Sequence, residues 1–74
     1  MPPELREILT NVLEVKSISE QDSAETIANW DSVRHLTLMT AIEERFDIVF
    51  DADQMMTLTS VAEIVNALDR RGPP

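Results

Sequence analysis

The chain has 74 residues, a formal net charge of -8 and 43% hydrophobic residues, which is enough apolar content for one small folded domain over residues 1–74. Fourteen acidic residues against six basic ones exclude nucleic acids and anionic membranes as expected partners, because Lys and Arg supply most of the affinity for phosphates. The absence of cysteine excludes disulfides and thiolate metal sites, and a single glycine with no tyrosine argues against an all-β fold.

The acidic residues gather in two stretches. Residues 14–31 hold five acids and one lysine, and residues 43–53 hold five acids and one arginine, so each stretch has a net charge of -4. Such clusters favour a docking surface for basic proteins.

The N-terminus lacks the basic and apolar regions of a signal peptide, and no apolar run reaches the roughly 18 residues of a membrane span. We therefore expect a cytoplasmic, monomeric protein.

The first predicted element is a helix that opens at Pro2-Pro3-Glu4, because proline suits a first helical turn and an acid faces the positive dipole end. Its apolar stripe has helical spacing and comprises Leu5, Ile8, Leu9, Val12 and Leu13. A long loop from Lys16 to Trp30 follows, because this stretch lacks a helical period and is rich in Ser, Asp and Asn. We expect the loop to be fixed to the core by Ile18, Ile27 and Trp30, and a short helical turn fits around residues 23–28.

The second predicted helix runs from Ser32 to Phe46. Its expected buried stripe consists of Val33, Leu36, Met39, Ile42 and Phe46, widened by Leu38 and Ala41. Other faces of this helix carry four residues that become candidates for contact with solvent or a partner: Arg34, Thr37, Thr40 and Glu44.

The remaining elements are shorter. Phe46, Ile48 and Phe50 alternate, but a lone strand has no pairing partner, so we predict an extended connector. One or two helical turns follow at Asp51–Met56. The last helix begins near Ser60, whose spacing to Glu63 is that of a capping box, and it ends at Arg70-Arg71 before Gly72-Pro73-Pro74. The sum is an all-α, small four-helix bundle with three long helices, a short third helix, and a long loop between the first two.

The pair Asp31-Ser32 marks the start of the second helix and is the strongest candidate site. The first amides of a helix lack intrahelical partners, and the helix dipole favours an anion there. Ser32 could therefore carry a phosphate-linked group. The alternative is that both residues are ordinary helix caps.

Three motifs in this order resemble the acyl carrier protein family, which includes peptidyl and polyketide carriers. The resemblance covers about Leu5 to Leu68. Asp31-Ser32-Val33 is similar to the family's Asp-Ser-Leu attachment signature. Ala41-Ile42-Glu43-Glu44-Arg45-Phe46-Asp47-Ile48 resembles the end of its second helix, and Thr57-Leu58-Thr59-Ser60-Val61 resembles the lead into its last helix.

The resemblance implies that Ser32, flanked by Asp31 and Val33, is the site at which a phosphopantetheinyl transferase attaches 4'-phosphopantetheine from coenzyme A. Acyl groups would be held as thioesters on this arm, whose thiol replaces the missing cysteine. The chain would then be a carrier and not an enzyme, without catalytic residues of its own. Its implied partners are acyl-activating and acyl-transferring or condensing enzymes with basic docking surfaces.

Several residues depart from the family pattern. Val33 replaces the usual leucine, and Trp30 is larger than the residue common at its position, where it either covers the base of the arm or anchors the core. Arg34, Thr37 and Thr40 stand where similar fatty-acid carriers tend to have acidic or apolar residues. These differences favour a dedicated or secondary pathway over housekeeping fatty-acid synthesis.

Three other functions are alternatives to a carrier. A hydrolase would use Ser32 and His35 with Asp31, but the geometry is poor, because a triad needs the acid to orient the histidine from its far side and a separate oxyanion hole. A metal site at Asp47, Asp51 and Asp53 lacks the glycine and closing glutamate of an EF-hand loop. The main alternative is an acidic helical protein-interaction module without a prosthetic group, in which Ser32 only caps a helix.

The methionines raise a question about cargo. If Met39, Met55 and Met56 face the interior, they could yield to admit a short acyl chain, although methionine more commonly serves to fill a core.

Overall fold

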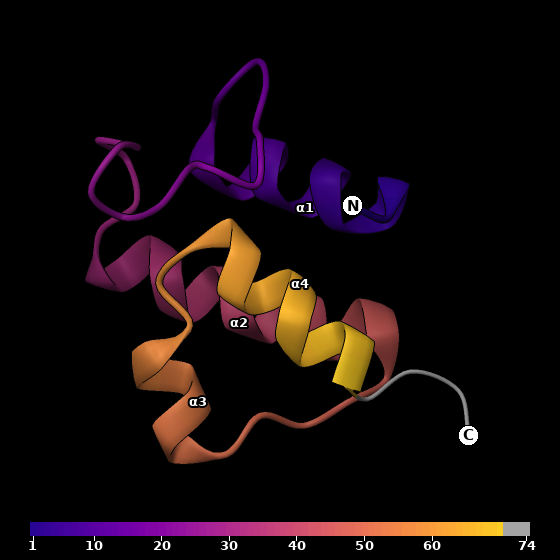
Figure 1. Ribbon diagram of the computed structural model, residues 1–74. Helices are drawn as coiled ribbons and strands as arrows, with labels where there is room; N and C mark the ends of the chain where they lie inside the picture. Colours follow the sequence, from indigo (N-terminus) through magenta and orange to yellow (C-terminus); the bar gives the residue numbers. More distant parts are fainter. Residues whose placement is uncertain (71–74) are drawn as a thin grey trace.

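The computed structural model describes residues 1–70, which form four α-helices. Their bounds are Pro3–Leu13 for α1, Ser32–Phe46 for α2, Ala52–Thr57 for α3 and Val61–Arg70 for α4. In the view of Figure 1, α2 and α4 lie between α1 and the short α3. The predicted all-α bundle, with its short third helix and long first loop, is confirmed. The stop signal at Arg71 to Pro74 lies outside the described residues.

The core is entirely apolar over the described residues. Its members come from every helix except α3 and from the connections, and they are Leu5, Leu9, Leu13, Ile18, Trp30, Leu38, Met39, Ile42, Phe50, Leu58, Val61, Ile64 and Ala67. Ile18 and Trp30 anchor the long loop, as expected, while Ile27 packs against the core from a partly buried position. Burial of these side chains is the main force that holds such short helices together.

The long loop is hydrogen-bonded to both ends of the fold. The Asn29 side-chain amide donates to the Leu13 carbonyl at the end of α1 (2.9 Å). Near α4, the Ala24 amide donates to the Thr59 carbonyl (2.9 Å) and the Val61 amide to the Asp22 carbonyl (3.0 Å). The turn expected around residues 23–28 is present as a single hydrogen-bonded turn. These bonds hold the segment that leads into Ser32.

The buried stripe predicted for α2 was wrong at two positions. Val33 is 74% exposed and Leu36 is 57% exposed, whereas Leu38, Met39 and Ile42 are fully buried. On a helix of 3.6 residues per turn, Val33 and Leu36 lie on the side opposite Leu38 and Ile42. Both sides of α2 carry apolar residues, and packing against the rest of the bundle selects the one with Leu38 and Ile42. The exposed side is left to face solvent.

The connections after α2 have the predicted character. Asp47 ends α2 in the left-handed conformation, and residues 48–50 form the connector, held by a hydrogen bond from the Phe50 amide to the Glu43 carboxylate (2.7 Å). Asp51 and Gln54 form a capping box at the start of α3. At α4 the Ser60 hydroxyl accepts from the Glu63 amide and donates to the Glu63 carboxylate. None of the helices within residues 1–70 is long and apolar enough to cross a membrane.

Candidate functional site at the start of the second helix

Ser32 is the first residue of α2 and is exposed. The residue before it, Asp31, is the N-cap: its carboxylate accepts a hydrogen bond from the Arg34 amide (2.8 Å), and its carbonyl accepts one from the His35 amide (2.8 Å). Because Asp31 does the capping, the Ser32 hydroxyl is not used for it. Within residues 1–70 this hydroxyl has no hydrogen-bond partner, so it is available for chemistry.

The surroundings of Ser32 suit an anion. Within the described part of the chain, the backbone amides of Ser32 and Val33 donate to no acceptor, as is usual for the first turn of a helix. The positive end of the α2 dipole reinforces these two donors. The Asp31 carboxylate is the nearest negative group in sequence, and it already accepts a bond from the helix. A phosphate linked to the Ser32 oxygen would therefore meet unused donors.

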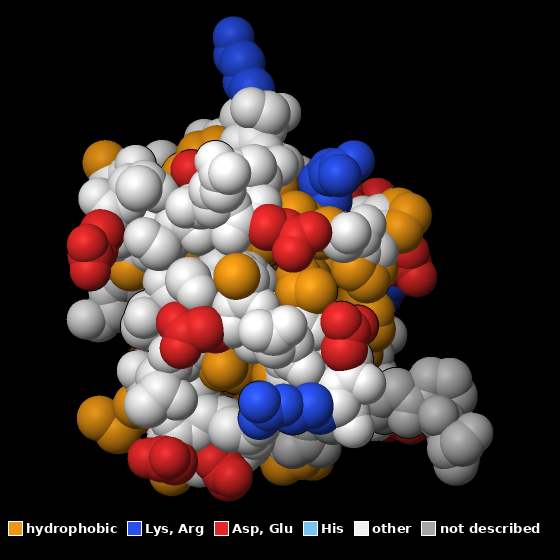
Figure 2. Space-filling model, in the orientation of Figure 1, with side chains coloured by type: hydrophobic (Ala, Val, Ile, Leu, Met, Phe, Trp, Pro, Cys, Tyr) orange, Lys and Arg blue, Asp and Glu red, His pale blue; other side chains and the backbone are white. Residues whose placement is uncertain are grey.

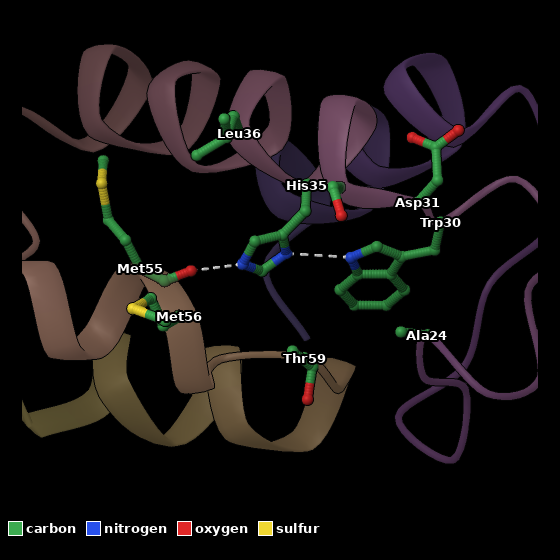
Figure 3. Close-up of a pocket in the computed structure, with 9 residues that line it drawn as sticks. Ala24, Trp30, Asp31, His35, Leu36, Met55, Met56 and Thr59 are labelled. Carbon is green, nitrogen blue, oxygen red and sulfur yellow. Dashed lines mark hydrogen bonds between the residues drawn. The ribbon is translucent and has the colours of Figure 1, made fainter.

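An open pocket of about 370 Å³ adjoins Ser32. It lies between the start of α2, the long loop and the α3 region, and it is lined by Ala24, Trp30, Asp31, Ser32, His35, Leu36, Met55, Met56 and Thr59. Figure 3 shows His35 between Trp30 and Met55 in this pocket. Most of the lining side chains are apolar, so the pocket offers contact area to an apolar group attached near Ser32.

His35 has both ring nitrogens in hydrogen bonds. The Trp30 indole N–H, which can only donate, lies 3.0 Å from Nδ1, so Nδ1 is the acceptor. The proton is then on Nε2, which donates to the Met55 carbonyl. Both ring nitrogens are therefore bonded to groups other than Ser32. The Asp31 carboxylate accepts from the Arg34 amide and is not bonded to the His35 ring. The three groups do not form a nucleophile, base and acid.

Three of the four predicted partner residues share one surface. Thr37, Thr40 and Glu44 are exposed and, with Leu36 and Ala41, line a second open hollow of about 370 Å³. Val33 lies on the same side of α2, closer to Ser32. We call this surface, made of Val33, Leu36, Thr37, Thr40, Ala41 and Glu44, the outer face of α2.

Arg34 lies elsewhere. Its guanidinium forms an ion pair with the Glu14 carboxylate and donates to the Val12 carbonyl (2.8 Å), both at the end of α1. A cation at this position also complements the negative end of the α1 dipole. Arg34 therefore connects α1 and α2 in addition to any contact it makes with a partner.

The pocket joins His35 to Met55, two residues that sequence reasoning had not grouped. Trp30 is only 4% exposed and is a core anchor, yet it also lines the pocket beside Ser32. The bond between His35 and Met55 joins residues 20 apart, and no local pattern predicts it. One signal was available: His35 lies on the same side of α2 as Leu38, Met39 and Ile42, and a polar group facing a core needs a partner.

Negative charge is spread over the face of the molecule seen in Figure 2. Figure 2 shows Asp and Glu side chains spread over one face of the molecule, with few Lys or Arg side chains among them. Within residues 1–70, no three His, Asp or Glu side chains come together in a way that could hold a metal ion.

A comparison with protein-family models gives a match that covers most of the chain. The family model described as "Phosphopantetheine attachment site" matches residues 3–68, which span all four helices up to the last turns of α4. A search of curated proteins found no match to the chain.

Proposed function

We propose that this chain, which belongs to the phosphopantetheine attachment-site family, is a carrier that holds acyl groups as thioesters on an arm at Ser32 and delivers them to partner enzymes. The family attaches 4'-phosphopantetheine covalently, and its domains are typically carriers without catalysis of their own. One observation carries the proposal most directly. Asp31 caps α2, so the exposed Ser32 hydroxyl has no structural task within the described residues.

The residues around Ser32 fit such an arm. The amides of Ser32 and Val33 can donate to the phosphodiester, and the exposed Val33 side chain leaves the approach to the hydroxyl open. When bound, phosphopantetheine supplies the thiol that a chain without cysteine lacks. Asp31 holds the first turn of α2 in place, and the neighbouring pocket offers apolar contacts. Tethering a cargo in this way raises its effective concentration at a docked enzyme.

The proposed partners follow from the charge and from the outer face of α2. A net charge of -8 attracts enzymes with basic docking surfaces, including a phosphopantetheinyl transferase and acyl-activating, acyl-transferring or condensing enzymes. Thr37, Thr40 and Glu44 are the proposed contacts, and Arg34 adds a contact at the edge of α2. The hydroxyl-bearing outer face favours a dedicated or secondary pathway. We further propose that the protein acts as a monomer in the cytoplasm.

Intact mass spectrometry tests the attachment. Incubation with coenzyme A and a broad-range transferase, shown to be active on a known carrier domain, should add one phosphopantetheine per chain. Ser32→Ala should abolish the addition, whereas Ser17→Ala, at an exposed serine in the long loop, should not. An unchanged mass of the wild-type protein would favour the acidic interaction module instead.

A further inference from the structure

Three residues that line the pocket beside Ser32, Trp30, His35 and Met55, form a polar bridge. The Trp30 indole N–H donates to His35 Nδ1 (3.0 Å), and His35 Nε2–H donates to the Met55 carbonyl. The two rings are nearly parallel, with an interplanar angle of 24° and centroids 6.2 Å apart. Figure 3 shows this chain of bonds running from the loop before Ser32, through α2, to α3.

The bridge satisfies groups that would otherwise lose their partners. The Met55 carbonyl lies in the last turn of α3, where carbonyls have no intrahelical donor, and the Thr59 amide that would reach it bonds to the Thr57 carbonyl instead. Trp30 is 4% exposed, so its N–H has little access to water. Moving the imidazole aside would leave both groups unpaired, which is costly for buried polar groups.

His35 stands between the pocket and the core. Met39 is one turn further along the same face of α2 and is fully buried, as is Leu38. Met56, on the outer side of the bridge, is 78% exposed, and Leu36 is 57% exposed. An apolar group near Ser32 can therefore cover the exposed Leu36 and Met56, whereas a path toward Met39 along the core side of α2 passes the His35 imidazole.

We infer that His35 is a specificity-determining residue that keeps the carried acyl group in the open pocket and out of the core. The inference rests on the proposed attachment at Ser32. It implies that a short acyl group gains all the contacts that the protein offers and that a longer chain projects into solvent, available to partner enzymes.

The test uses protein loaded from acetyl-, butyryl-, octanoyl- and dodecanoyl-coenzyme A, with loading at Ser32 first verified by intact mass. Absence of loading would count against the proposed function alone. In the wild-type protein, Tm should stay within about 2 °C from the butyryl to the dodecanoyl form. In His35→Ala, a long chain can be buried, so the dodecanoyl form should have a Tm at least about 4 °C above the butyryl form.

Two controls separate this role from simple loss of stability. His35→Gln can accept from the Trp30 N–H and donate to the Met55 carbonyl, so it should restore the flat Tm series, and Asn66→Ala on the exposed surface of α4 should behave as wild type. Trp30 is the only tryptophan, so its fluorescence can be followed on its own. Its emission should change with the length of the acyl chain in His35→Ala but not in the wild-type protein. If His35→Ala does not fold, the Tm values of the wild-type acyl forms still test the inference. A wild-type Tm that rises steadily with acyl-chain length overturns it. A flat series in folded His35→Ala overturns it as well.

Discussion

Asp31 determines which oxygen at the start of α2 remains reactive. Serine and aspartate are both good N-cap residues, so either could have accepted the bond from the first turn. The cap is the Asp31 carboxylate, and the backbone there is extended, with φ of -101° and ψ of -176°. The serine that follows is then the first helical residue, with its hydroxyl exposed. Capping and the proposed attachment thus fall to adjacent residues.

Asp31→Ala should lower the free energy of unfolding by about 1 kcal/mol, because the Arg34 amide loses its acceptor. Asp31→Asn should retain most of that stability, since an amide oxygen can accept the same bond. Urea unfolding followed by circular dichroism measures both variants. Equal losses in the two would contradict the capping role and point to the charge of Asp31 acting on the helix dipole.

Arg34→Ala should cost about 1.5 kcal/mol of unfolding free energy, because the Val12 carbonyl loses its donor and Glu14 loses its ion pair. The pair itself contributes little of this, since its side chains are 34% and 64% exposed. Arg45→Ala removes an equal charge from an exposed site on the same helix and should change stability by less than about 0.5 kcal/mol. Matching losses in thermal unfolding would show that only charge matters.

At the scale of elements, α3 depends on its neighbours. A helix of six residues is not stable alone. Its start is fixed by the capping box of Asp51 and Gln54, and a carbonyl of its last turn is bonded to His35 of α2. The connector before it is fixed from α2 as well, through Glu43. Because α3 forms one wall of the pocket beside Ser32, the shape of that pocket is set by bonds from α2.

Glu43→Ala should lower the free energy of unfolding by about 2 kcal/mol, because the Phe50 amide loses a charged acceptor close to a side chain that is 4% exposed. For a domain of this size, that corresponds to a fall in Tm of roughly 8–16 °C. Glu43→Gln keeps an acceptor oxygen and should recover about half of the loss. Calorimetry measures all three proteins, and a Gln variant as unstable as the Ala variant would refute the role of this hydrogen bond.

Local signals in the sequence were sufficient to place the elements but not to orient all of them. Pro3, Asp31 and Asp51 mark the helix starts because their chemistry acts within one turn. Local signals could not predict which side of α2 is buried, because Val33 and Leu36 form an apolar stripe on the side opposite the core. The bridge from Trp30 through His35 to Met55 was equally inaccessible, because it depends on packing between separate elements.

For the molecule as a whole, charge and shape act together in partner docking. In the proposed docking, the net charge of -8 would attract basic proteins over long range, and the outer face of α2 would supply short-range contacts through Leu36, Thr37 and Thr40. The two contributions differ in their response to salt. Charges separated by more than a Debye length are screened, whereas apolar contacts are not weakened.

The loading of Ser32 by a broad-range transferase should therefore be sensitive to salt, with kcat/KM falling several-fold between about 0.05 and 0.3 M NaCl. Glu44→Lys should lower kcat/KM by about tenfold at low salt, mainly through KM, because it places a like charge on the proposed docking face. Glu7→Lys makes the same change in net charge at an exposed position on α1 and should lower kcat/KM much less. If both variants lose activity equally, the attraction comes from the net charge of the whole molecule, and the outer face of α2 has no special part in docking.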